Sequence, residues 1–255
     1  MSIASYADSL LPNIHNMFSI AWKWLKAWHQ INLKFYLYPI YLVLLFLLSS
    51  LLQHDAQKYA VQGVDVSRYQ RQVDWKTLQQ EGGVHFAFIK ATEGSSYQDP
   101  YFDYNWATAR KVGVLRGAYH FYRAEQSPLW QAKKFIKTVQ LRKGDLPPVL
   151  DVEKVDKVDK ATLIKDLTIW LNTIEEHYKI RPIIYASLDL YKRHLHQAFP
   201  NHLVWIARYS RRQPPLELEW YFWQYSETMQ LPGIKGYVDG NVFSGSYRQL
   251  RQICW

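Results

Sequence analysis

Cysteine is almost absent from this 255-residue sequence, since Cys254 is its only one. A single cysteine excludes an internal disulfide framework and a cysteine-rich zinc site. The HExxH, Walker, GxSxG and GxGxxG motifs are absent as well, which argues against the enzyme classes built on them. Acidic residues are outnumbered, with 22 Asp and Glu against 31 Lys and Arg. The net charge of +9 favours an acidic partner, such as nucleic acid, anionic lipid or a cell-wall polymer.

Long apolar runs are scarce, and the one exception lies near the N-terminus. Residues 35–52 contain no charged side chain, and their 18 positions just exceed the minimum of about 17 for a membrane-spanning helix. We therefore expect a single transmembrane signal-anchor there, preceded by an interfacial segment at residues 1–34. A cleaved signal peptide is the alternative, but residues 53–60 offer no clean small-x-small cleavage site. A buried core helix is the third possibility.

The charges around this run predict its orientation. Lys23, Lys26 and Lys34 precede it, whereas Lys58 alone lies in the 15 residues that follow. Positive charge favours the cytoplasmic side of a membrane. We therefore expect a cytoplasmic N-terminus and a domain on the periplasmic or extracytoplasmic side.

The chain after a polar connector at residues 53–60 alternates between strand and helix signals. Short runs rich in apolar, β-branched and aromatic residues predict eight buried strands. They are residues 63–67, 85–92, 115–122, 148–153, 183–187, 203–209, 220–226 and 237–243. Helical periodicity predicts five helices between the first six strands, at residues 74–80, 100–112, 129–140, 160–178 and 188–199. We expect no helix after residue 209.

Five β/α units followed by three nearly bare strands predict an α/β fold of the (β/α)5(β)3 type. This is a TIM-like barrel, in one domain at residues 61–255. The domain is shorter than the about 250 residues of a complete (β/α)8 barrel, and three missing helices explain the difference. An open doubly wound sheet is the alternative.

Four acidic residues lie in or at the ends of the predicted strands, namely Asp65, Asp151, Glu153 and Asp239. A charge in an apolar strand is costly to bury unless it is paired or its pKa shifts. Asp151 and Glu153 are two residues apart, so their side chains share one face of the strand. They also lie at its carboxyl end, where barrel enzymes place their active sites.

Paired carboxyl groups in one cleft suit glycoside hydrolysis. One group donates a proton to the leaving oxygen, and the other stabilises the oxocarbenium ion, activates water or attacks the sugar. A Mg²⁺ or Ca²⁺ site is the rival interpretation, because acids at strand ends also bind these ions. A solvated strand edge is the third, since a D-x-E tripeptide alone is common.

A series of motifs in this chain resembles the glycoside hydrolase family 25 lysozymes, the Chalaropsis-type muramidases. The motifs follow the family's order and span nearly all of the chain after residue 61. They include GVDVSRYQ at 63–70, FAFIKATEG at 86–94, GAYHFYR at 117–123, PPVLDVE at 147–153, PIIYAS at 182–187, LVWIARY at 203–209, WQYS at 223–226 and GYVDGNVF at 236–243.

The resemblance implies a flattened barrel and hydrolysis of the β-1,4 bond between N-acetylmuramic acid and N-acetylglucosamine in peptidoglycan. By match to the family's D-V-E motif, Glu153 would be the general acid/base. Asp151 would orient the acetamido group of the substrate or polarise the site, and Asp65 and Asp239 match other acids of the cleft. A substrate-assisted route through the N-acetyl group then retains the configuration. No metal or cofactor is implied.

Further residues in or at the ends of the strands are candidates for binding the sugar by stacking or hydrogen bonding. They are Tyr119, Tyr185, Trp205, Trp223 and Gln224. Packing inside the barrel is the alternative for each aromatic residue. His120 adjoins Tyr119 and faces the other way, so we expect it to be a packed histidine.

The expected partners are peptidoglycan glycan strands and, through the anchor, a membrane. No nucleic-acid recognition motif is present, so we expect no nucleic-acid partner, and we expect a monomer. A non-catalytic peptidoglycan-binding protein on the same fold is the alternative function. The four strand-end carboxyl groups argue against it, because binding alone does not require them.

Overall fold

The computed structural model describes residues 19–27, 39–43, 54–155 and 158–255. The chain divides into two units, Met1–Gln53 and His54–Trp255. In the first unit, residues 19–27 and 39–43 are helical. Most of the predicted transmembrane segment, at 35–38 and 44–52, lies outside the described residues, as does much of the predicted interfacial segment. Among the described residues, no helix combines the length and the apolar character needed to span a membrane.

Eight strands close into a barrel within the described part of the second unit. They are β1 (Val61–Val66), β2 (Phe86–Glu93), β4 (Leu115–Phe121), β5 (Val149–Val152), β6 (Ile183–Ser187), β7 (Val204–Ala207), β8 (Phe222–Met229) and β9 (Val238–Phe243). Neighbouring strands are parallel from β1 to β8, and β9 pairs antiparallel with both β8 and β1. A short β3 (Tyr97–Gln98) pairs with the end of β2. The α/β barrel is thus confirmed, and the pairings of β1 with β2 and β9 exclude an open sheet.

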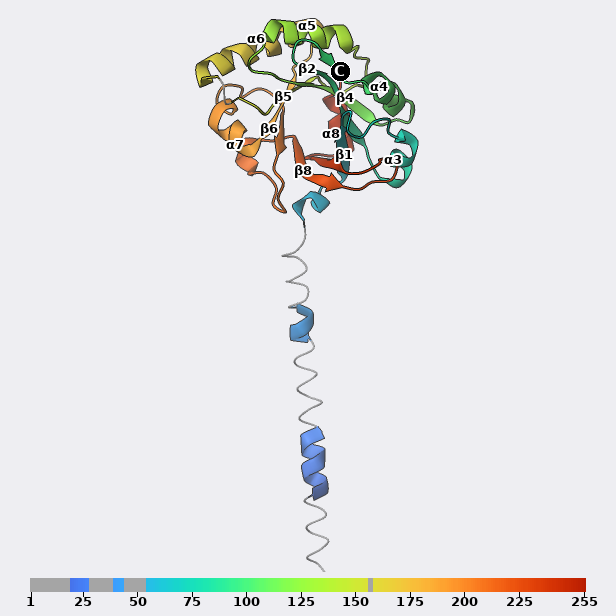
Figure 1. The fold of residues 1–255 in the computed structure, drawn as a ribbon. Helices are drawn as coiled ribbons and strands as arrows, with labels where there is room; N and C mark the ends of the chain where they lie inside the picture. Colours follow the sequence, from blue (N-terminus) through green and yellow to red (C-terminus); the bar gives the residue numbers. More distant parts are fainter. Residues whose placement is uncertain (1–18, 28–38, 44–53, 156–157) are drawn as a thin grey trace, which may run out of the picture. The chain divides into compact units, whose positions relative to one another are not determined.

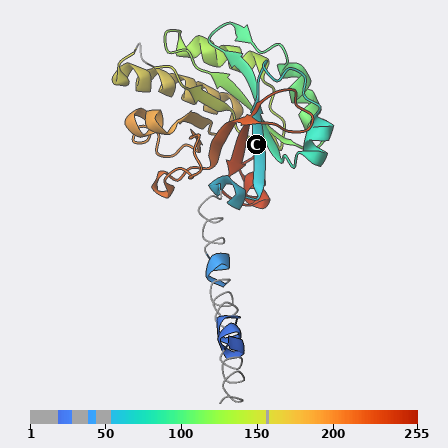
Figure 2. The same cartoon turned by 60° about the horizontal axis from the view of Figure 1, so that its bottom comes forward.

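The helices form an arc around the strands (Figure 1), and Figure 2 shows this arc from another side. They are α3 (Trp75–Glu81), α4 (Phe102–Lys111), α5 (Pro128–Thr138), α6 (Lys160–Tyr178) and α7 (Leu188–Leu190), which continues as the π-helical segment η2 (Tyr191–Leu195). The side chains of Asp74, Ser127 and Asp159 accept hydrogen bonds from the first turns of α3, α5 and α6. These N-caps fix where the helices begin. The five predicted helices are confirmed, although the last ends before residue 199.

Three helical segments differ from the predictions. Helix α8 (Tyr247–Gln252) follows β9, so the expectation that no helix lies beyond residue 209 is wrong. A reciprocal capping box between Ser246 and Gln249 starts it. Two single turns, η1 (Asp55–Lys58) and η3 (Leu216–Leu218), were not expected either. Asp55 in η1 is buried and accepts a hydrogen bond of 3.1 Å from the backbone of Gln213, so the predicted connector is part of the folded unit from His54 onward.

Aromatic rings fill the inside of the barrel. Phe88 and Trp205 stack with ring centroids 4.4 Å apart, and Phe86, Phe222 and Phe243 pack around them. Two glycines make room for these rings. A Cβ atom at Gly63 would lie 2.4 Å from the Phe86 ring, and one at Gly117 would lie 2.6 Å from the Phe88 ring. The barrel is therefore solid below its carboxyl end, as expected for a packed core.

Candidate active site

The four predicted acids gather at the carboxyl end of the barrel. Asp65 lies near the end of β1, Asp151 lies in β5, and Glu153 directly follows that strand. Because β9 runs in the opposite direction, Asp239 near its beginning lies at the same end, where it is the register partner of Asp65. The structure therefore brings together the acids that strand position alone had suggested.

Gln224 on β8 joins two of these acids to two tyrosines. Its Nε2 donates to Asp65 Oδ2 at 2.8 Å and to Asp239 Oδ2 at 3.1 Å. Its Oε1 accepts from the hydroxyls of Tyr185 at 2.7 Å and Tyr209 at 2.9 Å. A primary amide offers two donors and two acceptor lone pairs, so Gln224 is fully used. Its orientation fixes the positions of all four partners.

Asn241 also holds Asp65. Its Nδ2 donates to Asp65 Oδ2 at 2.7 Å, and its Oδ1 accepts from Trp205 Nε1 at 2.8 Å. The Trp205 ring is buried, stacked on Phe88 and in edge contact with Tyr185. Phe88 and Tyr185 therefore occupy the surface of the Trp205 ring that a sugar would need for stacking. Trp205 thus supports the site from below and orients Asn241.

Asp65 and Asp239 behave as one titrating pair. Burial raises the pKa of Asp65 well above its ordinary value, and the charge of Asp239 raises it further. Burial also raises the pKa of Asp239, to about 6. Both Oδ2 atoms accept from the same amide nitrogen, so two negative charges would stand close together. Full ionisation is costly under these conditions, and the pair retains a proton at mildly acidic pH.

Asp151 and Glu153 form a second pair, with few hydrogen bonds. The Asp151 side chain is buried, and its Oδ1 finds no hydrogen-bond partner among the described residues. Glu153 is exposed at the mouth of the barrel. Loss of hydration raises the pKa of Asp151, and the charge of Glu153 adds to this rise. The protein around the Glu153 carboxyl removes enough water to raise its pKa as well.

A cluster of charged residues that the sequence analysis missed flanks this pair. Lys90 Nζ lies 2.6 Å from Glu93 Oε2, and Arg123 Nε lies 3.0 Å from Glu93 Oε1. The positive charge of Lys90 lowers the pKa of both Asp151 and Glu153 and so opposes the effect of burial. The alternation in FAFIKATEG could have revealed Lys90, because it shares a strand face with Phe86 and Phe88.

The tyrosines predicted to bind sugar lie among the acids. Tyr119 is buried, and the charges of Asp65, Asp151 and Asp239 add to the rise in its pKa that burial causes. Tyr185 opposes Asp151 across the pairing of β5 with β6. Tyr209, which was not predicted, joins them through Gln224. It lies two residues beyond the end of β7, where the alternation that begins at Trp205 places it on the same side.

The structure does not bring Trp223 to this cluster. Its side chain is buried outside the barrel, where it stacks on His54 and packs against Trp220 and Tyr225. The physical reason is strand alternation. Gln224 faces inward, so its neighbour on β8 faces outward.

His120 also faces outward, as predicted. Its ring contacts Thr92 Oγ1 at 2.7 Å and Gln131 Oε1 at 3.0 Å, and it stacks on Trp170. Burial lowers its pKa to about 4, so the ring is neutral at pH 7. It is a packed histidine and does not contact the acids.

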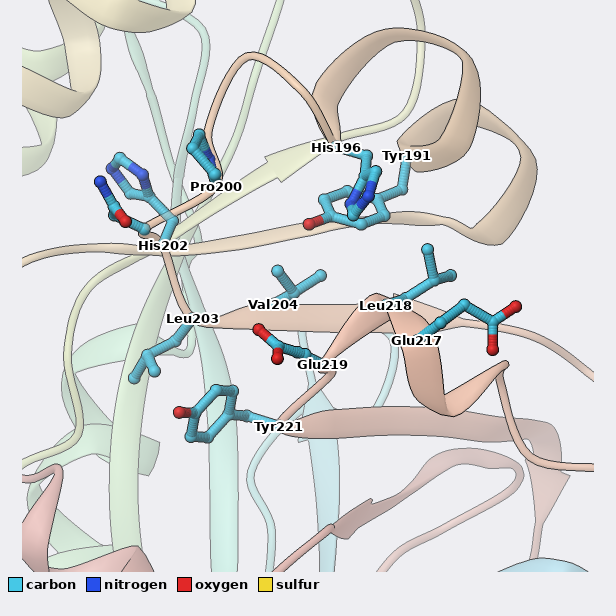
Figure 3. A pocket seen from close by; sticks show the side chains of 11 residues that line it. Tyr191, His196, Pro200, His202, Leu203, Val204, Glu217, Leu218, Glu219 and Tyr221 are labelled. Carbon is cyan, nitrogen blue, oxygen red and sulfur yellow. The ribbon is translucent and has the colours of Figure 1, made fainter.

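Another hollow lies at the opposite end of the barrel. It has a volume of about 330 Å³, and Val204 at the beginning of β7 lines it together with η2 and η3 residues such as Tyr191 and Leu218 (Figure 3). Barrel chemistry takes place at the carboxyl ends of the strands, whereas this hollow opens at an amino end. Within the described ranges, no three His, Cys, Asp or Glu side chains are arranged to hold a metal ion.

Comparison with known proteins identifies the family of this chain. The model of the glycosyl hydrolases family 25 matches residues 64–234. The chain belongs to glycosyl hydrolase family 25. A solved family 25 glycosyl hydrolase from Bacillus anthracis has a TM-score of 0.73 and 35% identity, and the match covers 78% of this chain and 96% of that one.

Two relatives found by sequence cover about three quarters of this chain. Lysozyme M1 from Streptomyces globisporus is 32% identical over 211 residues, covering 76% of this chain and 71% of the relative. The uncharacterized protein YegX from Escherichia coli (strain K12) is 41% identical over 198 residues, covering 76% of this chain and 73% of the relative. The family 25 match includes Asp65, Asp151 and Glu153, whereas Asp239 lies just beyond it.

Proposed function

We propose that this protein cleaves the β-1,4 bond between N-acetylmuramic acid and N-acetylglucosamine. Its family and its similarity to lysozymes make it a glycosidase that hydrolyses peptidoglycan. The observation that carries the proposal is the pair formed by a buried Asp151 and an exposed Glu153 with a raised pKa. Hydrolysis requires a carboxylic acid that still holds its proton near neutral pH and that the substrate can reach.

Glu153 is the general acid in this proposal. Burial raises its pKa and so favours the protonated form, which gives its proton to the leaving sugar oxygen. The resulting carboxylate then takes a proton from the attacking water. Since Glu153 is exposed and Asp151 is buried, only Glu153 can approach the glycosidic oxygen of a bound chain directly.

Asp151 acts on the acetamido group of the sugar. Its side chain accepts no hydrogen bond from the described residues, and Oδ2, which is not enclosed as Oδ1 is, can accept the N–H of that group. This contact turns the acetamido carbonyl toward the anomeric carbon, where its oxygen attacks as the leaving group departs. Water then opens the cyclic intermediate from the same face as the departed sugar, so the configuration is retained. No enzyme nucleophile is needed.

The network around Asp65 and Asp239 shapes the site. Gln224 and Asn241 hold the acids, and Tyr119, Tyr185 and Tyr209 provide hydroxyls at the same end of the barrel. We assign substrate binding to these tyrosines, and Gln224 acts through Tyr185 and Tyr209, whose hydroxyls it positions. Trp205 contributes through Asn241.

The replacement Glu153→Gln tests this assignment. Glutamine has nearly the same shape but cannot donate an acidic proton, so we expect the release of reducing ends from peptidoglycan to fall by about 10²- to 10⁴-fold. The matched control is Glu176→Gln, an exposed position on α6, which should leave the rate unchanged. A Glu153→Gln rate within tenfold of wild type would rule out this residue as the general acid.

Product analysis by mass spectrometry tests the bond. Wild-type protein should release fragments that end in reducible muramic acid. Anhydro-muramic ends would indicate a lytic transglycosylase, and binding without any product would indicate the non-catalytic alternative.

We further propose that residues 35–52 anchor a monomeric enzyme in a membrane, with residues 1–34 in the cytoplasm and the catalytic domain on the periplasmic or extracytoplasmic side. The uncharged run and the three lysines before it support this orientation. Fractionation of cells and protease treatment of intact spheroplasts provide the test. Recovery of the protein in the soluble fraction, or protection of its catalytic domain from the protease, would contradict the proposal.

A further inference from the structure

Cations and aromatic rings alternate along one rim of the barrel mouth. The Arg123 guanidinium lies 4.8 Å from the Phe121 ring, and Lys90 Nζ lies 4.7 Å from the same ring. Lys90 Nζ also lies 5.9 Å from the Tyr97 ring. The Arg68 guanidinium lies 5.9 Å from the same Tyr97 ring and 5.1 Å from the Tyr69 ring. We call these six residues the cationic track.

The cationic track begins beside the catalytic pair. Phe121 is the register partner of Asp151 in the pairing of β4 with β5. The charge of Lys90 acts on Asp151 and Glu153, and that of Arg123 acts on Glu153. The track then leaves the catalytic pair and passes over β2 and β3 toward the loop that follows β1. A ligand bound at Glu153 can therefore extend along it.

The cationic track leads to a hollow of about 590 Å³. Tyr69 lines this hollow together with Arg71, Tyr101 and Lys235, and no acidic residue lines it. It lies between the loop after β1 and the loop before β9, which a 3.0 Å hydrogen bond from Gln70 Nε2 to the Tyr237 carbonyl holds together. Both loops are at the carboxyl end of the barrel, the same end as the four acids.

Three cations at the far end of the track and in the hollow lack acidic partners among the described residues. Among the described residues, Arg68, Arg71 and Lys235 form no ion pair, whereas Lys90 and Arg123 share Glu93. Asp99 lies nearby, but it is buried, and its oxygens accept from the backbone N–H groups of Arg68 and Tyr101. The hollow and the far end of the track therefore present uncompensated positive charge, which attracts carboxylates.

We propose that the cationic track and this hollow bind the acidic peptide that muramic acid carries in peptidoglycan. This inference rests on the proposed function. The glycan occupies the cleft at Asp151 and Glu153, and the peptide attached to its muramic acid lies along the track. The carboxylates of the peptide contact Arg68 and Lys235, and its apolar side chains lie on the rings of Tyr69 and Tyr97. The enzyme thereby selects glycan that still bears its peptides.

The test compares two substrates and two double variants of the full-length protein. The substrates are intact peptidoglycan and the same glycan after an amidase has removed its peptides. The test variant is Arg68→Ala with Lys235→Ala. The matched control is Lys137→Ala with Lys165→Ala, which removes the same charge from exposed positions on α5 and α6.

We expect the test variant to raise KM for intact peptidoglycan about tenfold, the size of exposed charge-assisted contacts. The rise in KM for the glycan without its peptides should be at least fivefold smaller. The control variant should match wild type on both substrates. An equal rise in KM of the test variant on the two substrates, or no rise on either, would overturn the inference.

A binding measurement separates this inference from the proposed function. The Glu153→Gln protein is titrated with two soluble disaccharides, one bearing the acidic peptide and one with a free lactyl carboxylate only. We expect the peptide-bearing disaccharide to bind about tenfold more weakly when Arg68→Ala and Lys235→Ala are added. The bare disaccharide should be unaffected. If wild type hydrolyses neither substrate, the proposed function fails, but the binding measurement still decides the inference. Equal binding of the peptide-bearing disaccharide with and without Arg68→Ala and Lys235→Ala would overturn it.

Discussion

The two acid pairs at the barrel mouth differ in how the protein surrounds them. Asp65 accepts two hydrogen bonds on Oδ2, from Gln224 and Asn241, and Asp239 accepts one from Gln224. The Asp151 side chain, in contrast, accepts no hydrogen bond from the described residues, and the Lys90 ammonium acts on it instead of an amide. Hydrogen bonds to the protein hold a carboxyl in place, whereas a carboxyl without them can still accept a bond from a substrate.

This difference separates support from chemistry within a single site. A carboxyl that must exchange a proton or receive a substrate N–H gains nothing from strong internal hydrogen bonds. A carboxyl that shapes the cleft does gain from them, because they hold it in one orientation. If the distinction is correct, a substitution at Asp151 should reduce activity more than stability. A substitution around Asp65 should reduce stability more than activity.

The largest expected effect comes from Asp151→Asn. The amide keeps the shape but replaces one acceptor oxygen by a donor, so the contact with the acetamido N–H is lost. We expect kcat to fall by about 10²- to 10³-fold, as for other single groups that stabilise a transition state. The free energy of unfolding, measured with urea, should be unchanged or higher, because a poorly solvated carboxyl is removed. A marked loss of stability would contradict the contrast between the pairs.

Asn241→Leu should show the reverse balance. It leaves Asp65 with one donor fewer and Trp205 Nε1 without its acceptor. Two buried polar groups lose partners, so we expect the free energy of unfolding to fall by about 2–4 kcal/mol. The control is Asn172→Leu at an exposed position on α6, which should change stability by less than about 0.5 kcal/mol. Equal stability of Asn241→Leu and wild type would show that the network does not support the fold.

Lys90→Gln should move the pH profile of activity. Its charge lowers the pKa of Asp151 and Glu153, so its removal raises both pKa values. The rate–pH curve should then shift toward higher pH, whereas Lys137→Gln on α5 should leave it in place. A shift toward lower pH, or none, would show that Lys90 does not set the protonation of the catalytic pair.

The smallest effect concerns the pH dependence of stability. Burial raises the pKa of Asp239 from 3.8 to about 6, so the folded state binds more protons than the unfolded state in this window. Stability from this group is present below pH 4 and is lost as the pH rises through about 6. His120, with a pKa lowered to about 4, gives a slope of opposite sign in the same range.

The difference between wild type and Asp239→Asn isolates the contribution of this acid. Urea denaturation at pH 4, 5, 6 and 7 should give the variant the more positive slope of stability against pH. Parallel curves would mean that Asp239 titrates alike in the folded and unfolded states.

The order of strands and helices was predictable because each element carries its own pattern. Strand β6 and helix α6 begin and end at the predicted residues, since each is a clear periodic run with sharp boundaries. Helix α8 was missed, although Ser246 and Gln249 have the spacing of a capping box. Its six residues are too few to show a helical period, so the cap was the available signal.

The part of the site that could be predicted is the part that shows within single strands of the sequence. Asp65, Asp151, Glu153 and Asp239 were recognised because acids in apolar strands are unusual. Trp223 and Gln224 could not both face the site, because consecutive strand residues alternate. The role of Asn241 depends on β9 lying beside β1, and that pairing is a property of the closed barrel.

The rings that fill the barrel also decide how a polymer can reach the acids. Because the floor beneath the site is closed, a sugar chain cannot thread through the molecule, and it enters and leaves by the same mouth. Cleavage then needs one face of a glycan strand to be accessible. The rate should follow the amount of glycan exposed at the surface of the wall.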